Sequence, residues 1–181
     1  MLHAIVKAAV DVTAASGGWL LGRASGQLTV RAAAGADVDT APLAGVSIPE
    51  GSGTSGFVIA SGQPLALSAR PDDPRLAEGI AAHLGLRPST VLCVACEAGD
   101  HVVGALELID KAGGAAFSFD DVELATLLAS IGAVALAATV TERVTVATPA
   151  SLGNDLARLA DLDPARYELV ASAVGALLDR G

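Results

Sequence analysis

The stretch that decides the fold is VLCVACEAGDHVVGALELI, residues 91–109. Two apolar runs, 91–96 and 102–109, are rich in valine and leucine and long enough to form strands. Four of the five residues between them, 97–100, include the glycine and acidic residues that are typical of a tight reversal. Strands joined by so short a loop pair antiparallel. This segment therefore predicts a β-hairpin in an antiparallel sheet.

The regions on either side predict further strands and flanking helices. A second hairpin is expected from residues 19–23 and 27–32 around the Ser25-Gly26 turn, and short strands are expected at 46–49 and 64–67. Helices are predicted from residue 2 to a stop near 16–18, after the glycines at 51–56, at 75–84, and from 118 to 143. This order predicts the class α+β, with the two end helices on one face of the sheet and short helices and loops forming a pocket on the other.

The long C-terminal helix of this region has two apolar faces. Ser118 and Asp121 stand at the spacing of a capping box and predict its start. We expect the larger side chains to face the core, namely Leu124, Leu127, Leu128, Ile131 and Val134. We expect the smaller ones to form a surface that a second helix can approach closely, namely Ala125, Ala129, Ala133 and Leu136.

Composition excludes some classes of partner. The 181 residues carry a net charge of −9, so a nucleic-acid backbone would be repelled, and only 3% are aromatic, which leaves little surface for base stacking. The apolar stretch 124–140 is interrupted by polar residues and predicts a buried helix rather than a membrane span. Without an export signal and with two cysteines, the chain is expected in the cytoplasm.

Cys93 and Cys96 form a C-x-x-C motif, which invites a redox or metal interpretation. On one strand, three residues place the two side chains about 10 Å apart and on opposite faces, too far for a disulfide. No second C-x-x-C is present, and the three histidines are scattered, so no metal site is expected. The motif predicts buried structural thiols, with one pocket-facing reactive thiol as the alternative.

Five segments in the expected order and spacing make residues 1–145 resemble the GAF domain family. They are residues 48–58 with 61–65, residues 72–75, residues 89–95, residues 103–111 and residues 117–121. The resemblance implies an α+β sensor or regulatory domain with a ligand pocket, and no catalytic residues, metal or cofactor beyond an unidentified small ligand.

Some members of that family carry a signature that ends the last strand and begins the last helix. Lys111, Phe117 and Asp121 match it, whereas Asp110 stands for an asparagine and Val122 for a glutamate. The resemblance implies that Asp110, Lys111, Phe117 and Asp121 form a structural latch built around a Lys–Asp ion pair. The two departures mean that the signature of the cyclic-nucleotide binders is incomplete.

Candidate ligand-binding residues follow from their expected position beside the pocket. They are Ser55, Arg70, Asp72, Arg75, His83 and Cys93. For His83 the alternative is a surface position on a helix, and for residues 70–75 it is a solvated loop in which Asp73 caps the helix that follows.

Residues 146–181 lie outside the resemblance. Their apolar spacing and the Asp163-Pro164 helix start predict two short amphipathic helices, which cannot be stable alone and must pack on something. We therefore expect a GAF domain over 1–145 and a helical hairpin over 146–181 that packs on the domain or docks a partner protein.

We expect a bacterial homodimer joined through the end helices, signalling when a small molecule or partner protein binds. The first alternative is a pocketless adaptor that mediates assembly, and the second is a free methionine sulfoxide reductase.

Overall fold

The computed structural model describes residues 1–70, 73, 76, 78–143, 149–164, 167, 168 and 170. The chain divides into two compact units, Met1–Thr139 and Val140–Gly181. The predicted boundary between 145 and 146 stays a prediction.

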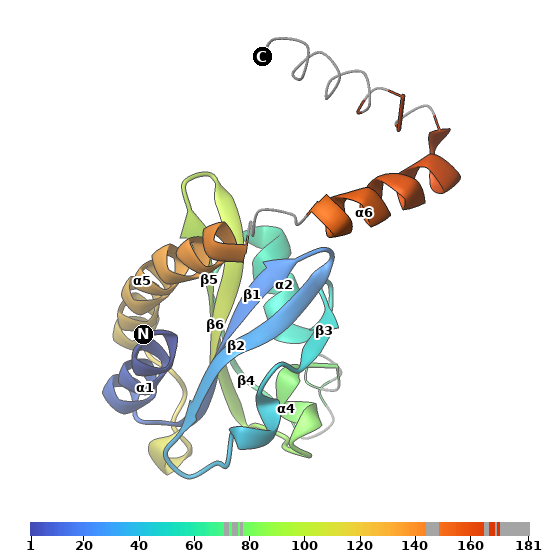
Figure 1. Ribbon diagram of the computed structural model, residues 1–181. Helices are drawn as coiled ribbons and strands as arrows, with labels where there is room; N and C mark the ends of the chain where they lie inside the picture. Colours follow the sequence, from blue (N-terminus) through green and yellow to red (C-terminus); the bar gives the residue numbers. More distant parts are fainter. Residues whose placement is uncertain are drawn as a thin grey trace. The chain divides into compact units, whose positions relative to one another are not determined.

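The first unit is built on a six-stranded antiparallel sheet in the order β3-β2-β1-β6-β5-β4 (Figure 1). The strands are β1 (Ala15–Ala24), β2 (Gln27–Gly35), β3 (Ser47–Pro49), β4 (Leu65–Ser68), β5 (Thr90–Ala98) and β6 (His101–Lys111). The helices are α1 (Leu2–Thr13), α2 (Gly53–Ser61), α4 (Ile80–His83) and α5 (Phe119–Arg143), with 3-10 turns η1 (Ala41–Leu43) and η2 (Ala112–Gly114). The predicted α+β class is confirmed.

Both predicted hairpins are present. Ala98 pairs with His101, so the β5–β6 loop has two residues rather than four, and Gly99 supplies a positive φ of 60°. The β1–β2 turn is equally tight, with φ of 51° at Ser25 and 74° at Gly26, as a type I′ turn requires.

The first helix is shorter and the first strand longer than the sequence predicts. Helix α1 ends at Thr13, where Ala14 adopts a left-handed φ of 53°, and β1 already begins at Ala15. Gly18 lies inside the strand because β6 approaches it closely: a Cβ there would stand 2.9 Å from the carbonyl oxygen of Glu107. Gly18 therefore makes close strand packing possible, and neither Gly17 nor Gly18 ends the helix.

Helices α1 and α5 cover one face of the sheet, as expected (Figure 1). The predicted orientation of α5 is wrong, because its alanine face is the one that packs on the sheet. The buried residues of α5 include Ala125, Ala129, Ala133 and Leu136, whereas Leu124, Leu127, Ile131 and Val134 are 41–71% exposed. Leu128 is half-buried against the core.

A close helix-to-sheet approach explains this orientation. A Cβ on Gly132 of α5 would lie 3.2 Å from Leu20 of β1, and one on Gly104 of β6 would lie 2.8 Å from Leu136 of α5. Only small side chains fit such a separation, so the face that carries Leu124, Leu127, Ile131 and Val134 points away from the sheet. The segment Phe119–Ala138 is apolar and long enough to cross a membrane by composition, a test that the core helix of a soluble protein also passes.

Helices α2 and α4 cover the opposite face. Gly62, with a φ of 68°, ends α2 as predicted. Of the predicted helix 75–84, the structure has α4 over Ile80–His83, and residues 74, 75 and 77 lie outside the described residues.

The second unit contains helix α6 (Pro149–Leu162). Asp163 follows it, and its carbonyl accepts a hydrogen bond from the Tyr167 N–H. The rest of the predicted second helix, residues 171–181, lies outside the described residues.

Candidate functional site

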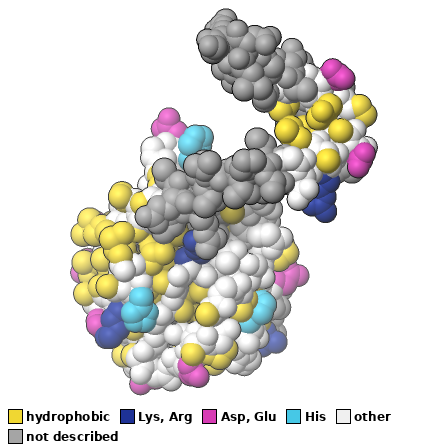
Figure 2. All heavy atoms as spheres, in the orientation of Figure 1, with side chains coloured by type: hydrophobic (Ala, Val, Ile, Leu, Met, Phe, Trp, Pro, Cys, Tyr) yellow, Lys and Arg dark blue, Asp and Glu magenta, His cyan; other side chains and the backbone are white. Residues whose placement is uncertain are grey.

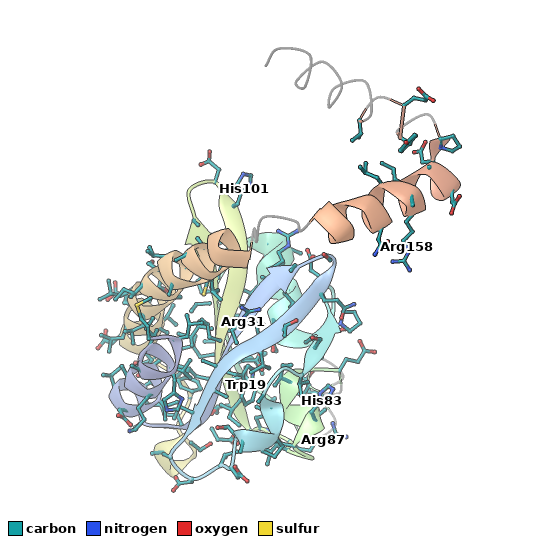
Figure 3. The ribbon with its side chains drawn as sticks, in the orientation of Figure 1. Trp19, Arg31, His83, Arg87, His101 and Arg158 are labelled. Carbon is teal, nitrogen blue, oxygen red and sulfur yellow. The ribbon has the colours of Figure 1, made fainter. Side chains whose placement is uncertain are left out.

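Strand register brings three unlike side chains into a row on the α2 face of the sheet. Trp19 of β1 is the register partner of Glu107 on β6, and Glu107 is in turn the partner of Cys93 on β5. Figure 3 labels Trp19 in the interior of the sheet. Thr54 and Ser55, in the first turn of α2, cover Glu107 from above. We call these five residues the Glu107 cluster.

Glu107 is the only charged residue among the described side chains that lies on the floor of this face. It is 3% exposed, and its Oε2 accepts hydrogen bonds from Thr54 Oγ1 at 2.7 Å and Ser55 Oγ at 2.5 Å. Desolvation raises the pKa of the carboxyl, and the two hydroxyl donors lower it only in part. No lysine, arginine or histidine of the described residues forms an ion pair with it.

The indole of Trp19 adds a second unusual group. Its Nε1 is buried and has no hydrogen-bond partner among the described residues. The N–H lies near enough to Glu107 to lower the pKa of that carboxyl, although its geometry falls outside hydrogen-bond limits. A buried donor without a partner costs about 1–3 kcal/mol, so the cluster holds unsatisfied polarity inside an apolar core.

The two thiols lie on opposite faces of β5, as the sequence predicts. Cys93 belongs to the α2 face, with its Sγ 4.0 Å from Ser55 Oγ, and Cys96 belongs to the α1/α5 face. Burial raises the pKa of Cys96 to about 12 and that of Cys93 well above its ordinary value, with the Glu107 charge adding to the rise. Both thiols are therefore protonated at neutral pH, a form that is a poor nucleophile.

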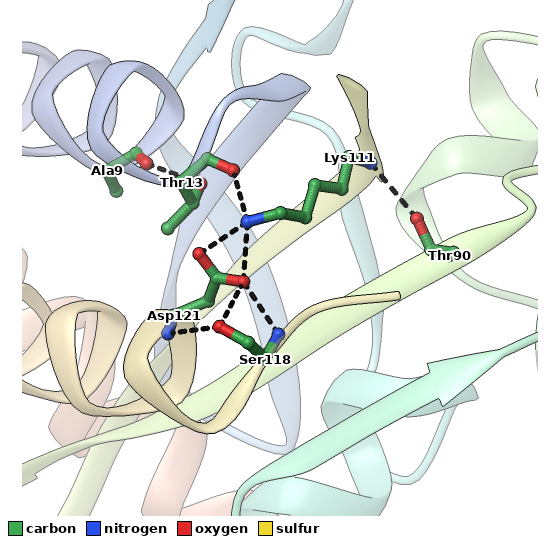
Figure 4. Close-up of polar contacts among 6 residues, drawn as sticks. All are labelled: Ala9, Thr13, Thr90, Lys111, Ser118 and Asp121. Carbon is green, nitrogen blue, oxygen red and sulfur yellow. Dashed lines mark hydrogen bonds and ion pairs between the residues drawn. The ribbon is translucent and has the colours of Figure 1, made fainter. Parts of the chain in front are cut away.

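Polar contacts among six residues of α1, β5, β6 and the start of α5 join the sheet to both end helices (Figure 4). Lys111 Nζ donates to the Thr13 carbonyl at the end of α1 and contacts both carboxylate oxygens of Asp121, in α5, at 2.6 Å. Ser118 and Asp121 exchange hydrogen bonds in the predicted capping box. Burial alone would raise the pKa of Asp121, but the bonds from Lys111 and Ser118 outweigh it and hold the pKa below its ordinary value.

Asp110 and Phe117 complete the arrangement. Asp110 has a φ of 50°, and its carboxylate accepts bonds from the backbone and side chain of Ser89. Lys111 Nζ lies 5.9 Å from the centre of the Phe117 ring. Lys111, Phe117 and Asp121 thus meet at one corner of the first unit, whereas Asp110 bonds Ser89, and the latch role of these four residues stays a prediction.

The four predicted ligand-binding residues that the structure describes do not gather in one place. Ser55 and Cys93 lie in the Glu107 cluster, whereas Arg70 and His83 are exposed and do not contact Glu107. Asp72 and Arg75 lie outside the described residues.

Sequence reasoning missed Glu107, Thr54 and Trp19. The available signal was Glu107 itself, a charged residue in the middle of a strand that is apolar on both sides. Its partners could not be found from the sequence, because register and the placement of α2 bring them together.

Residues 1–136 match the sequence profile of the GAF domain. The chain belongs to the GAF family. No curated protein matches the chain in sequence. Among solved structures, the second GAF domain of DevS from Mycobacterium smegmatis is 24% identical, with a TM-score of 0.60, over 78% of this chain and 94% of that one.

Two further GAF structures show the range of the family. The GAF domain of the Acinetobacter phosphoenolpyruvate-protein phosphotransferase has a TM-score of 0.64 at 17% identity, over 77% of this chain and 82% of that one. The type II free methionine-R-sulfoxide reductase of Thermoplasma acidophilum has a TM-score of 0.58 at 18% identity, over 74% and 88%. At such identities the likeness concerns the fold alone. GAF domains are generally regulatory or sensory, yet one of these relatives is an enzyme.

Proposed function

We propose that this chain is a regulatory GAF domain that binds a small polar molecule beside the Glu107 cluster and signals through α1 and α5. The single observation that carries this proposal is the enclosed carboxyl of Glu107. A core that needed only stability would hold an apolar residue there, since a buried carboxyl costs free energy unless its hydrogen bonds are satisfied.

The Trp19 indole supports the same conclusion. Its unpartnered N–H and the carboxyl of Glu107 present a donor and an acceptor on neighbouring strands. A ligand with both kinds of group would contact the two together, and its binding would recover the cost of leaving the indole N–H without a partner among the described residues.

Strand β6 connects this cluster to the end helices. Lys111 follows Glu107 by four residues, about 13 Å along the strand, and contacts α1 and α5 directly. A shift of β6 on ligand binding would therefore change how the two helices pack, provided the ligand binds the two packings unequally.

Native mass spectrometry of the purified protein tests the ligand. We expect an additional mass that denaturation releases, that Glu107→Gln abolishes, and that the exposed β5 variant Glu97→Gln retains. A wild-type protein that carries no additional mass and whose Trp19 fluorescence is unchanged by Glu107→Gln would contradict ligand binding at this cluster.

An assembly adaptor is the second candidate, and the outward face of α5 favours it. Leu124, Leu127, Ile131 and Val134 follow the 3-4-3 spacing of a coiled-coil seam and are all exposed. Figure 2 shows hydrophobic side chains gathered on the side of the molecule where Figure 1 places α5 and α1.

The adaptor hypothesis requires a homodimer through α5, with the C-terminal helices as a further docking site for a partner protein. Sedimentation equilibrium of wild type, Leu127→Ser with Ile131→Ser, and the control Thr126→Ser would measure it. We expect a dimer that only the double variant dissociates. A monomeric wild type at high micromolar concentration would contradict this second candidate.

The reductase alternative has a direct assay. Turnover of free methionine sulfoxide by wild type, Cys93→Ser and Cys96→Ser is expected to be equally negligible, because both thiols are protonated. Turnover that is lost in Cys93→Ser would instead establish an enzyme.

A further inference from the structure

A groove of about 630 Å³ lies along the outer edge of β2, away from the Glu107 cluster. Strand β3 pairs only with Gln27–Thr29, and the last bond on this edge runs from the Val30 N–H to the Val46 carbonyl. Beyond that point the only described strand beside β2 is β1, and the loop after β2 folds back on β1, where Ala36 and Asp37 donate to the Ser16 carbonyl. The uncovered edge forms the floor of the groove.

The groove has one basic wall and an apolar floor. His3 and Lys7, one turn apart on α1, form the wall, and Arg31 projects from β2. The remaining lining is mostly small and apolar, and includes Val30, Ala32, Ala34, Val38, Ala41 and Ala44. Its volume falls in the range of small-molecule pockets, which is about 300–1,000 Å³.

Arg31 is held in place by a feature of the neighbouring strand. Its Cγ would stand only 2.9 Å from a Cβ on Gly22, so the glycine leaves room for the arginine stem. Arg31 is half-buried and forms no ion pair with a described side chain. Figure 3 labels it on β2. A guanidinium that is positioned and has no ion-pair partner among the described residues is suited to bind a carboxylate or phosphate.

The other two basic groups are available to a ligand. Lys7 pairs with Asp11 at 2.7 Å, but both side chains are more than half exposed, so the pair is weak and exchangeable. His3 Nδ1 donates to the Ala33 carbonyl at 2.8 Å, which fixes the ring beside the floor of the groove. Asp39 is the one acidic lining residue, and its Oδ1 accepts the Ala41 N–H.

We propose that this β2-edge groove binds an organic anion with a carboxylate or phosphate head on a compact apolar body. The head lies between Arg31, Lys7 and His3, and the body covers the alanine and valine floor. In a chain of net charge −9, basic groups on one wall attract the anion to this place rather than elsewhere on the surface.

The test uses NMR titration of the full chain with phenyl phosphate, benzoate and the uncharged benzyl alcohol, at constant ionic strength. We expect saturable shifts of His3, Lys7 and residues 32–34 with a dissociation constant of about 1 mM or below for at least one anion. Comparing the two anions distinguishes a phosphate ligand from a carboxylate ligand. Benzyl alcohol is expected to bind at least tenfold more weakly.

Variants separate a built site from general charge attraction. Arg31→Gln is expected to weaken binding at least tenfold, and Lys7→Gln, on an exposed helix position, about threefold. The control Arg87→Gln removes an exposed arginine outside the groove and is expected to change nothing. Thermal unfolding checks that each variant folds, and Lys7→Gln keeps the test valid if Arg31→Gln does not.

Three results would overturn the proposal. They are the absence of saturable shifts up to about 10 mM of both anions, equal binding of benzyl alcohol, and equal loss of affinity in Arg87→Gln.

Discussion

The two faces of one sheet differ in what they bury. The face under α1 and α5 is packed with alanine, valine and leucine, and glycines bring helix and sheet together. The face under α2 and α4 is equally enclosed, but it holds Glu107, Thr54 and Ser55 among its apolar residues. Alternate residues of β6 point to opposite faces, so Leu106 and Leu108 lie on the side of α1 and α5, while Glu107 lies on the side of α2.

This difference shows that burial alone does not identify the functional face. Both faces are buried, yet among the described residues only the α2 face holds a buried carboxyl without a cationic partner. The α1/α5 face is expected to be destabilised by added side-chain volume, whereas the α2 face is expected to be sensitive to a change of charge. Four measurements test that contrast.

The largest effect on the free energy of unfolding is expected for Gly104→Ala on the α1/α5 face. A Cβ there would stand 2.0 Å from the Leu21 carbonyl oxygen and 2.8 Å from Leu136, so the backbone must shift. We expect the free energy of unfolding to fall by about 3 kcal/mol or more, as for severe overpacking. Gly51→Ala, where a Cβ meets nothing within 4 Å, is the matched control for urea denaturation. A small effect at Gly104 would show that this face is not closely packed.

Asp121→Ala is expected to cost about 2 kcal/mol. It removes the acceptor of Lys111 and half of the capping box, and leaves a partly buried ammonium without its carboxylate. Because the Asp121 pKa is lowered in the fold, its contribution is present above the ordinary value of 3.8 and is lost as pH falls below it. Asp120→Ala, exposed in the same turn, is the control. If both variants lost the same unfolding free energy, the effect would come from removing a negative charge at the start of α5 and not from the Lys111–Asp121 contact.

Glu107 is expected to give the opposite pH dependence. Its pKa is raised in the fold, so the folded protein binds more protons than the unfolded chain above the ordinary pKa of 4.5. Stability should therefore be greatest below pH 4.5 and fall as pH rises through the folded pKa, by up to about 1.4 kcal/mol per pH unit relative to Glu107→Gln. Parallel stability profiles of the two proteins from pH 5 to 8 would show that the carboxyl does not titrate there.

The smallest effect is expected on the outer face of α5. Leu127→Ala, at 62% exposure, should change the unfolding free energy of the monomer by less than about 0.5 kcal/mol. At the same protein concentration, substitution of the adjacent Leu128 by alanine should lower the unfolding free energy by more than about 1 kcal/mol, because Leu128 is half-buried against the core. If Leu127→Ala were the more destabilising, the orientation of α5 described above would be wrong.

Local patterns were enough to predict much of the fold. The alternation of residues 91–109, the Ser25-Gly26 turn, the Gly62 helix end and the Ser118–Asp121 capping box all act between near neighbours in the chain, and the structure confirms them. The opposite placement of Cys93 and Cys96 follows from strand periodicity in the same way.

Local patterns failed where the choice depended on a distant surface. Both faces of α5 are apolar, so hydrophobicity alone does not show which one is buried. The close approach of α5 to the sheet at Gly22 and Gly104 leaves room only for the alanine face. The glycines at 17 and 18 look like a helix stop, but their pairing with β2 and β6 makes them strand residues.

By itself the sequence determined the α+β class, the hairpins, the GAF resemblance and the Ser118–Asp121 capping box. The tertiary structure decided which face of α5 is buried and which side chains surround Glu107. The physical reason is that periodicity shows which residues share a face, whereas strand register and the closeness of packing determine what that face meets.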